Sequence, residues 1–173
     1  MKIFLTTLSI LFSTGVFGAN STQTLLGATE EGETLTIFFD SVVVQDLNNE
    51  IGLSSSIKGL GMFKYSLDQN ALSIQRSQSA GQNSRMRVVE KSGTGKKGVT
   101  TGLLFVALVE GESGAEIASD HSLALMKKFE SINTVLLQVE NLRDLDDVRD
   151  ALESDPRVVS TELDIYYGEA VLQ

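Results

Sequence analysis

A continuous run of apolar residues, Leu103–Val109, constrains the fold of this 173-residue chain more than any other stretch. Such a run is typical of a strand at the centre of a sheet. A helix signal follows closely, because Ser113 precedes Glu116 by three residues, as in a capping box. We therefore expect a strand over Leu103–Val109 and a short helix over Ser113–Asp120.

The next two segments extend this pattern toward a sheet. Leu123–Phe129 fits either a continuation of the helix or a strand. Thr134–Val139 alternates in polarity, which predicts a strand with Val135, Leu137 and Val139 on one face.

A second helix is expected over Asp144–Ser154, where acidic residues at the start suit the helix dipole. Its apolar positions recur at helical spacing: Leu145, Val148, Ala151 and Leu152. Asp155-Pro156 would end this helix, and a last strand would run from Val158 to Ile165. The order β-α-β-β-α-β predicts a ferredoxin-like domain over residues 99–165, with two helices on one sheet face and the other face available.

The part before this domain, residues 19–98, reads as a small antiparallel β module, so the predicted fold class is α+β. Short segments rich in β-branched and aromatic residues are expected to be strands, at 34–40, 42–44, 62–67, 72–75 and 85–90. The segments 62–67 and 72–75 would form a hairpin around residues 68–70. The glycine-rich stretch Ser92–Gly98 is expected to be a linker or loop.

The N-terminus has the layout of a secretory signal peptide. Lys2 precedes an apolar run, Ile3–Phe12, and small residues follow up to Ala19. We predict a signal peptide over residues 1–18 with cleavage after Gly18. The mature protein is then expected in the periplasm or outside the cell, with no membrane association after cleavage.

Charge and composition exclude several classes of function. The formal net charge is −9, which disfavours nucleic-acid binding. Residues 110–173 carry 15 acidic and 5 basic side chains, whereas residues 20–109 carry 8 of each. The acidic part is either a solvated face or a surface that meets positive potential. The absence of Cys excludes disulfides and thiolate sites.

Three motifs that resemble active sites are better explained without chemistry, so we expect no enzyme, no cofactor and no metal. Gly93–Gly98 matches the dinucleotide pattern GxGxxG, but a strand rather than a helix is expected after it. Ser113 and the single histidine, His121, could form a nucleophile and base only in a hydrolase motif that the sequence does not complete. The aspartates of Asp144–Asp150 are expected on the solvated side of a helix.

From Leu103 onward the sequence resembles the propeptide domain of subtilisin-like serine proteases. The resemblance rests first on the order of the segments, and on Lys127-Lys128-Phe129 and Ile132 in the turn and second strand. It rests further on Asp155-Pro156-Arg157-Val158, where the second helix ends, and on the acidic end of the last strand, Val159–Asp164. A chain that carries such a domain without a protease resembles the external chaperones of secreted kexin-like serine proteases, as in Aeromonas.

This resemblance implies that the protein is an external chaperone and inhibitor of a secreted subtilisin/kexin-like serine protease, in a 1:1 heterodimer. The open sheet face would pack on protease helices, and Glu162 and Asp164 would cap the N-termini of these helices. The strand alternation places both carboxylates on one face. The C-terminal tail, residues 166–173, would lie extended in the protease cleft; its residues are Tyr166, Tyr167, Gly168, Glu169, Ala170, Val171, Leu172 and Gln173. The alternative is a secreted ligand-binding or adhesion protein with a ferredoxin-like regulatory module.

Overall fold

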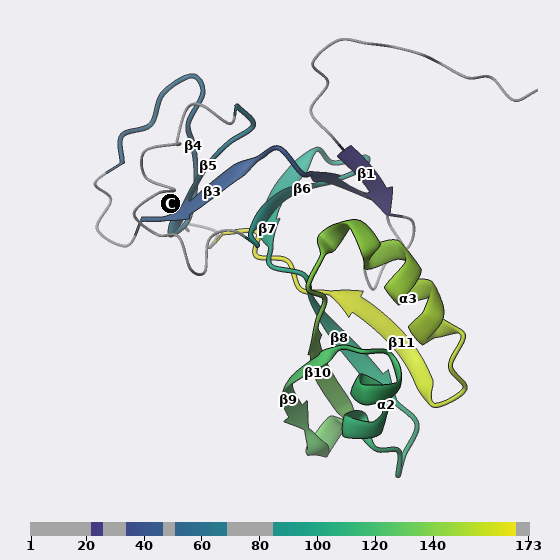
Figure 1. Ribbon diagram of the computed structural model, residues 1–173. Helices are drawn as coiled ribbons and strands as arrows, with labels where there is room; N and C mark the ends of the chain where they lie inside the picture. Colours follow the sequence, from purple (N-terminus) through teal and green to yellow (C-terminus); the bar gives the residue numbers. More distant parts are fainter. Residues whose placement is uncertain (1–21, 26–33, 47–50, 69–84, 169–173) are drawn as a thin grey trace, which may run out of the picture.

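A computed structural model describes residues 22–25, 34–46, 51–68 and 85–168 of the chain (Figure 1). Three antiparallel sheets and two α-helices make up these residues, which confirms the α+β class. The predicted signal peptide, the strand expected at 72–75 and the tail residues 169–173 lie outside the described residues. No described helix is long and apolar enough to cross a membrane.

The part of the chain before Leu103, here called the first unit, forms two of the sheets. One has the strand order β1-β2-β6-β7, with bounds Thr22–Leu25, Leu35–Phe38, Arg87–Lys91 and Lys96–Thr100. The other has the order β3-β5-β4, with bounds Val42–Gln45, Phe63–Ser66 and Lys58–Leu60. The strands predicted at 34–40, 42–44, 62–67 and 85–90 are thereby confirmed within a few residues.

The linker or loop expected at Ser92–Gly98 is confirmed as a turn only up to Gly95, because Lys96–Gly98 belong to β7. Strands β6 and β7 form a hairpin in which Lys91 pairs with Lys96 and Val89 with Gly98. Gly93 and Gly95 have φ of +88° and +65°, so glycine supplies the turn that joins them. The GxGxxG motif therefore marks a tight β-turn rather than a phosphate loop.

The second unit, residues 103–168, follows the predicted order of strands and helices. Its sheet has the order β11-β8-β10-β9, with bounds Val158–Leu163, Leu103–Leu108, Thr134–Gln138 and Ala124–Phe129. The helices are α2, Gly114–Asp120, and α3, Leu145–Glu153, and two 3-10 turns are η1, Glu130–Ile132, and η2, Leu142–Asp144. The ambiguous segment at 123–129 is a strand, because β10 pairs with it along its length.

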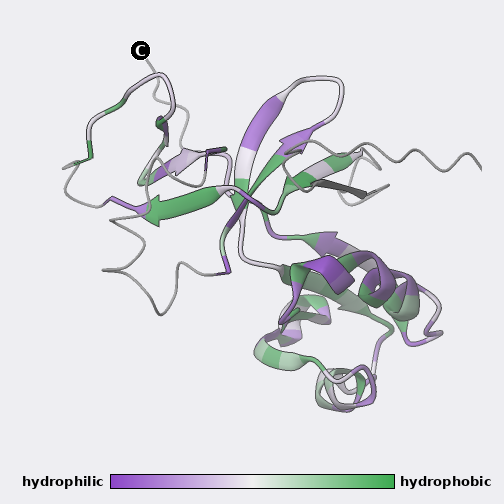
Figure 2. Cartoon of the chain, turned by 45° about the horizontal axis from the view of Figure 1, so that its top comes forward, coloured by the Kyte–Doolittle hydropathy of each residue, from purple (hydrophilic) through white to green (hydrophobic). Residues whose placement is uncertain are grey.

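Local signals define both helices. The Ser113 side chain accepts a hydrogen bond from the Glu116 backbone N–H at 3.4 Å, as the capping box predicts. Helix α3 buries Leu145 and Leu152, but Ala151 is exposed and Arg149 is buried instead. Arg149 is held by an ion pair with Glu153, at 3.2 Å. In Figure 2 much of α3 is coloured as hydrophilic, with hydrophobic residues between.

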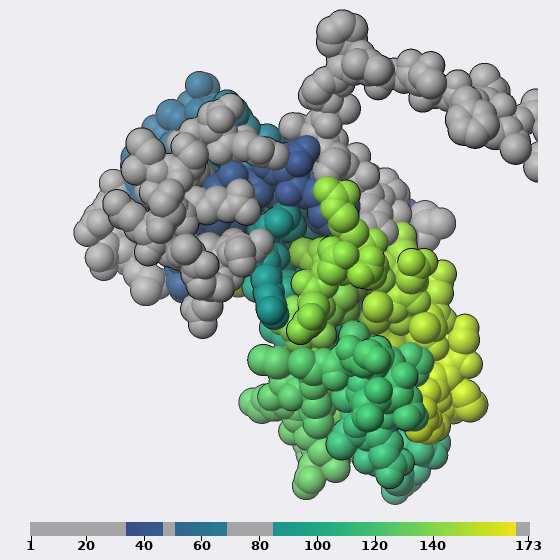
Figure 3. Space-filling view, in the orientation of Figure 1, coloured from purple at the N-terminus to yellow at the C-terminus, as the bar shows by residue number. Residues whose placement is uncertain are grey.

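One hydrophobic core joins the two units. Leu35, Ile37 and Val89 of the first unit belong to the same buried cluster as Leu104, Val106, Leu137 and Leu145 of the second unit. The Arg143 guanidinium lies 4.4 Å from the ring centroid of Phe39 and adds a contact at this junction. Figure 3 shows the second unit, green to yellow, as a lobe below the first unit.

Candidate functional site

The two faces of the β11-β8-β10-β9 sheet have different surroundings. In β8, Leu104, Val106 and Leu108 are buried, whereas Leu103, Phe105 and Ala107 between them are only partly buried. Both helices contact the sheet on the buried side, α3 at β11 and α2 at β9 and β10. The opposite side, here called the open face, is the structural candidate for an interaction surface, because no described helix covers it.

The strand register places one row of side chains across the whole open face. Glu162 of β11 pairs with Phe105 of β8, Phe105 with Leu136 of β10, and Leu136 with Lys127 of β9. The row thus begins with an acidic residue at one sheet edge, passes two large apolar residues, and ends with a basic residue at the other edge. This arrangement gives the face an apolar centre between opposite charges.

A neighbouring row adds a second aromatic ring to this face. Ala107 pairs with Thr134, and Thr134 with Phe129. The ring centroids of Phe105 and Phe129 are 6.1 Å apart. The Lys127 ammonium lies 4.8 Å from the Phe129 ring centroid. These contacts place Phe105, Phe129 and Lys127 together on the open face, where they form a partly exposed aromatic cluster.

The acidic residues predicted to bind a partner, Glu162 and Asp164, both belong to the edge at β11. Glu162 lies within the strand, and Asp164 follows its last residue, with its backbone N–H donating to Leu103 O at 2.8 Å. Partial burial raises the pKa of the Asp164 carboxyl above its usual value. The charged form of Asp164 is therefore destabilised in the free protein.

The predicted tail begins as an extended segment that packs on the first unit. Tyr166 forms an isolated antiparallel bridge with Val99 of β7. Tyr166, Tyr167 and Gly168 are all partly buried. Of the predicted tail residues, Glu169, Ala170, Val171, Leu172 and Gln173 lie outside the described part of the chain. Contact between the tail and a protease stays a prediction.

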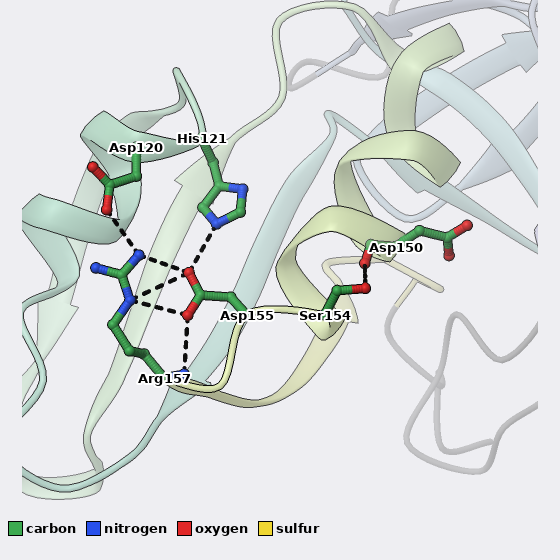
Figure 4. A network of polar contacts seen from close by, with 6 residues as sticks. All are labelled: Asp120, His121, Asp150, Ser154, Asp155 and Arg157. Carbon is green, nitrogen blue, oxygen red and sulfur yellow. Dashed lines mark hydrogen bonds and ion pairs between the residues drawn. The ribbon is translucent and has the colours of Figure 1, made fainter.

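His121 belongs to a polar network that joins α2 to the turn before β11 (Figure 4). Its Nε2 lies 3.1 Å from Asp155 Oδ2, and the Arg157 guanidinium contacts both Asp155, at 2.7 Å, and Asp120, at 2.8 Å. These contacts hold the pKa of Asp155 well below its usual range, chiefly through the hydrogen bonds from Arg157. Ser113 lies at the other end of α2, so the pair Ser113–His121 does not form a catalytic site. Within the described residues no cluster of potential metal ligands occurs.

One protein family matches this sequence, under the description "Open reading frame 2 N-terminal domain", over residues 64–169. The chain belongs to this family. The match starts in β5 and extends to the end of the second unit, so the family includes strands from both units. No curated protein and no solved structure matches the chain.

Family membership corrects the resemblance to subtilisin propeptides and to the chaperones built on them. No protease-propeptide family matches, and the family that does match begins about forty residues before the expected propeptide-like segment. The extent of the match agrees with the shared core, because Val89 belongs to the same buried cluster as Leu104 and Val106. Short motifs such as Asp155-Pro156 are compatible with many helix ends and did not identify the family.

The sequence interpretation did not identify the aromatic cluster of the open face. The sequence places Phe105 in a central strand, and it places Phe129 at the end of a segment that fits a helix or a strand. A signal was present, since every second residue of Leu103–Leu108 must point away from the side that the helices cover. The partners of Phe105 could not be predicted, because they depend on the register of three strands.

Proposed function

We propose that this protein is an external chaperone and inhibitor that binds a secreted subtilisin/kexin-like serine protease. The binding surface would be the open face of a ferredoxin-like domain formed by the second unit. The observation that carries the proposal is the row Glu162–Phe105–Leu136–Lys127 on a sheet whose other face is contacted by α2 and α3. Such a row suits a protein partner better than a small molecule, because it is broad and ends in opposite charges.

The apolar centre of the open face would pack on helices of the protease. Partly exposed Phe105, Leu136 and Phe129 would be removed from water on binding, and aromatic residues at the centre of an interface commonly dominate its energy. During folding of the enzyme, the same contact would cover apolar surface that promotes aggregation. This covering is the proposed chaperone activity.

The acidic edge would determine how the partner helices are oriented. A helix N-terminus carries unpaired N–H groups and a partial positive charge, and it binds carboxylates. Glu162 and Asp164 present carboxylates two residues apart along the edge at β11. The raised pKa of Asp164 supports this role, because a helix N-terminus would stabilise the ionised form that burial disfavours.

Inhibition would come from the C-terminal tail in the active-site cleft, and the complex would contain one copy of each protein. The predicted signal peptide would bring the protein to the periplasm or to the exterior, where the protease folds. No cofactor, metal or nucleic acid takes part in this proposal.

The test begins with immobilised mature protein, starting at Ala19, exposed to periplasmic and secreted proteins of the producing cell. Mass spectrometry identifies what is retained. We expect capture of a subtilisin/kexin-like protease that is inhibited while bound, and that regains activity from denaturant in higher yield when the protein is present. Immobilised protein with Glu162→Ala and Asp164→Ala should retain less of this protease. Retention of a carbohydrate or small ligand without a protease would instead favour the ligand-binding alternative.

A further inference from the structure

The last described residues of the chain are attached to the first unit by backbone pairing. The Tyr166 N–H donates to Val99 O at 2.8 Å, and the Val99 N–H donates to Tyr166 O at 2.8 Å. Both bonds of an antiparallel residue pair are therefore made, and Tyr166 adds to the outer edge of β7. In Figure 1 the yellow segment after β11 runs beside β7.

Side chains of the first unit hold the same segment from two sides. The rings of Tyr166 and Phe63 meet edge to face, with centroids 5.2 Å apart. The Lys96 ammonium lies 4.5 Å from the ring centroid of Tyr167. These contacts come from β5 and β7, strands that lie in different sheets of the first unit.

Two glycines leave the space that this segment occupies. A Cβ added at Gly98 would overlap Ile165 Cγ2 and would lie 3.0 Å from Tyr167 Cδ1. A Cβ added at Gly61 would overlap the Tyr166 hydroxyl. Glycine at these positions thus allows close approach of Ile165–Tyr167 to the first unit, a tolerance that no larger residue would give.

We propose that the first unit positions the C-terminal tail, by fixing its first described part, Ile165–Gly168, in one extended conformation. This role would explain why a unit whose described elements are strands accompanies the sheet that is proposed to bind the protease. The inference rests on the proposed function insofar as the tail is the inhibitory element. The anchoring itself can be measured without a partner.

Anchoring would strengthen inhibition by removing conformational freedom before binding. Ordering the backbone of one residue costs roughly as much free energy as a tenfold change in an equilibrium constant. A tail whose first residues are already extended avoids this cost on entering a cleft. Release of Ile165–Gly168 should therefore raise the inhibition constant by about tenfold or more.

The decisive variants are Gly98→Ala, which should displace Ile165, and Tyr166→Ala, which removes the ring that meets Phe63. Tyr166→Phe is the conservative partner, because it keeps the ring and both backbone bonds. Gly52→Ala is the matched glycine control, since a Cβ there meets nothing within 4 Å. Each variant is made in the full chain and in a chain that ends at Gly168.

The first measurement is amide hydrogen exchange in the free protein. Slow exchange at Tyr166, accelerated about tenfold or more in Gly98→Ala and Tyr166→Ala but unchanged in Tyr166→Phe and Gly52→Ala, supports the anchor. Fast exchange at Tyr166 in the unaltered chain would overturn it.

The second measurement is inhibition of the captured protease. The two disruptive variants should inhibit about tenfold more weakly in the full chain, and should match the unaltered sequence within about twofold when both end at Gly168. An equal loss in the truncated chains would show damage to the fold and overturn the positioning role. If hydrogen exchange shows that Ile165–Gly168 is released in a variant and the full-length variant still inhibits as strongly as the unaltered chain, the positioning role is overturned. The proposed function would remain intact. If the unaltered chain inhibits no protease, the proposed function and the positioning role both fail, although anchoring would still be visible in the exchange data.

Discussion

The two faces of the β11-β8-β10-β9 sheet share the same strands but have different partners. The covered face buries Leu104, Val106, Val135 and Leu137 beneath α2 and α3. The open face is not the polar surface that a solvated antiparallel sheet usually shows, because Phe105, Leu136 and Phe129 lie on it. The difference teaches that apolar residues on the two faces have separate roles: those on the covered face stabilise the fold, and those on the open face are available to a partner.

Adjacent residues of β10 give the largest expected effect. Leu137 is completely buried on the covered face, whereas Leu136 is partly exposed on the open face. Leu137→Ala should lower the free energy of unfolding by about 3 kcal/mol through lost burial and the cavity that remains. Leu136→Ala should cost less than about 1 kcal/mol. Urea titration measures the free energy of unfolding of both variants. An equal decrease in the two variants would contradict the distinction between the faces.

A smaller loss is expected from Asp155→Asn, which tests the polar contacts that join α2 to the start of β11. Asp155 accepts hydrogen bonds from the Arg157 side chain and lies beside His121. Because its pKa is lowered in the folded state, its contribution is present at neutral pH and is lost as the pH falls below the ordinary carboxyl pKa of about 4.

The difference in melting temperature between the unaltered chain and Asp155→Asn should therefore narrow below about pH 4. Asp150→Asn, at an exposed position of α3, is the control, and its unfolding free energy should stay within about 0.5 kcal/mol of that of the unaltered chain. If the difference in melting temperature between Asp155→Asn and the unaltered chain does not change with pH, the electrostatic explanation is contradicted.

On the open face, the double variant Glu162→Ala with Asp164→Ala should weaken protease binding about tenfold at low salt, and less at high salt, because screening reduces the attraction to helix N-termini. A matched control is Asp147→Ala with Asp150→Ala. This pair also removes two carboxylates, but from solvent-exposed positions of α3, the helix that packs on the opposite face of the sheet. Surface plasmon resonance at two salt concentrations measures both. Equal weakening by the control pair would mean that overall charge, rather than the acidic edge, guides binding.

The smallest effect is expected from Asp164→Asn in the free protein. Because burial raises the pKa of Asp164, the folded state binds its proton more tightly than the unfolded state does, and ionisation costs stability as the pH rises through this pKa. Asp164→Asn should therefore raise the melting temperature at pH 7, by less than about 2 °C, and should abolish this part of the pH dependence. If Asp164→Asn also weakens binding to the protease, Asp164 serves binding rather than stability. A lower melting temperature would contradict the assigned burial cost.

The second unit could be predicted from its sequence because its signals are local. The capping pair Ser113 and Glu116 and the alternation of Thr134–Gln138 each specify an element within a few residues. The first unit depends on distant pairs, since β2 at Leu35–Phe38 pairs with β6 at Arg87–Lys91. Such pairs leave no local pattern, so the order of strands in the sheets of the first unit could not be predicted.

The candidate site could likewise be predicted only where its signals are local. Strand alternation indicated that Glu162 and Asp164 share a side, but the apolar row next to Glu162 required the register of β8, β10 and β11. The attachment of Tyr166 to Val99 joins residues 67 positions apart in the sequence, and no local pattern near either residue predicts this pairing.

The central claim is that the open face binds the protease, and the affinity of Phe105→Ala with Leu136→Ala for the captured enzyme tests it most directly. Truncating two central apolar residues should weaken binding by about tenfold to a hundredfold, with the far-ultraviolet circular dichroism spectrum unchanged. Leu53→Ala, at an exposed leucine of the first unit, should leave the affinity unchanged. An affinity for the double variant equal to that of the unaltered protein, with the complex still formed, would contradict the account.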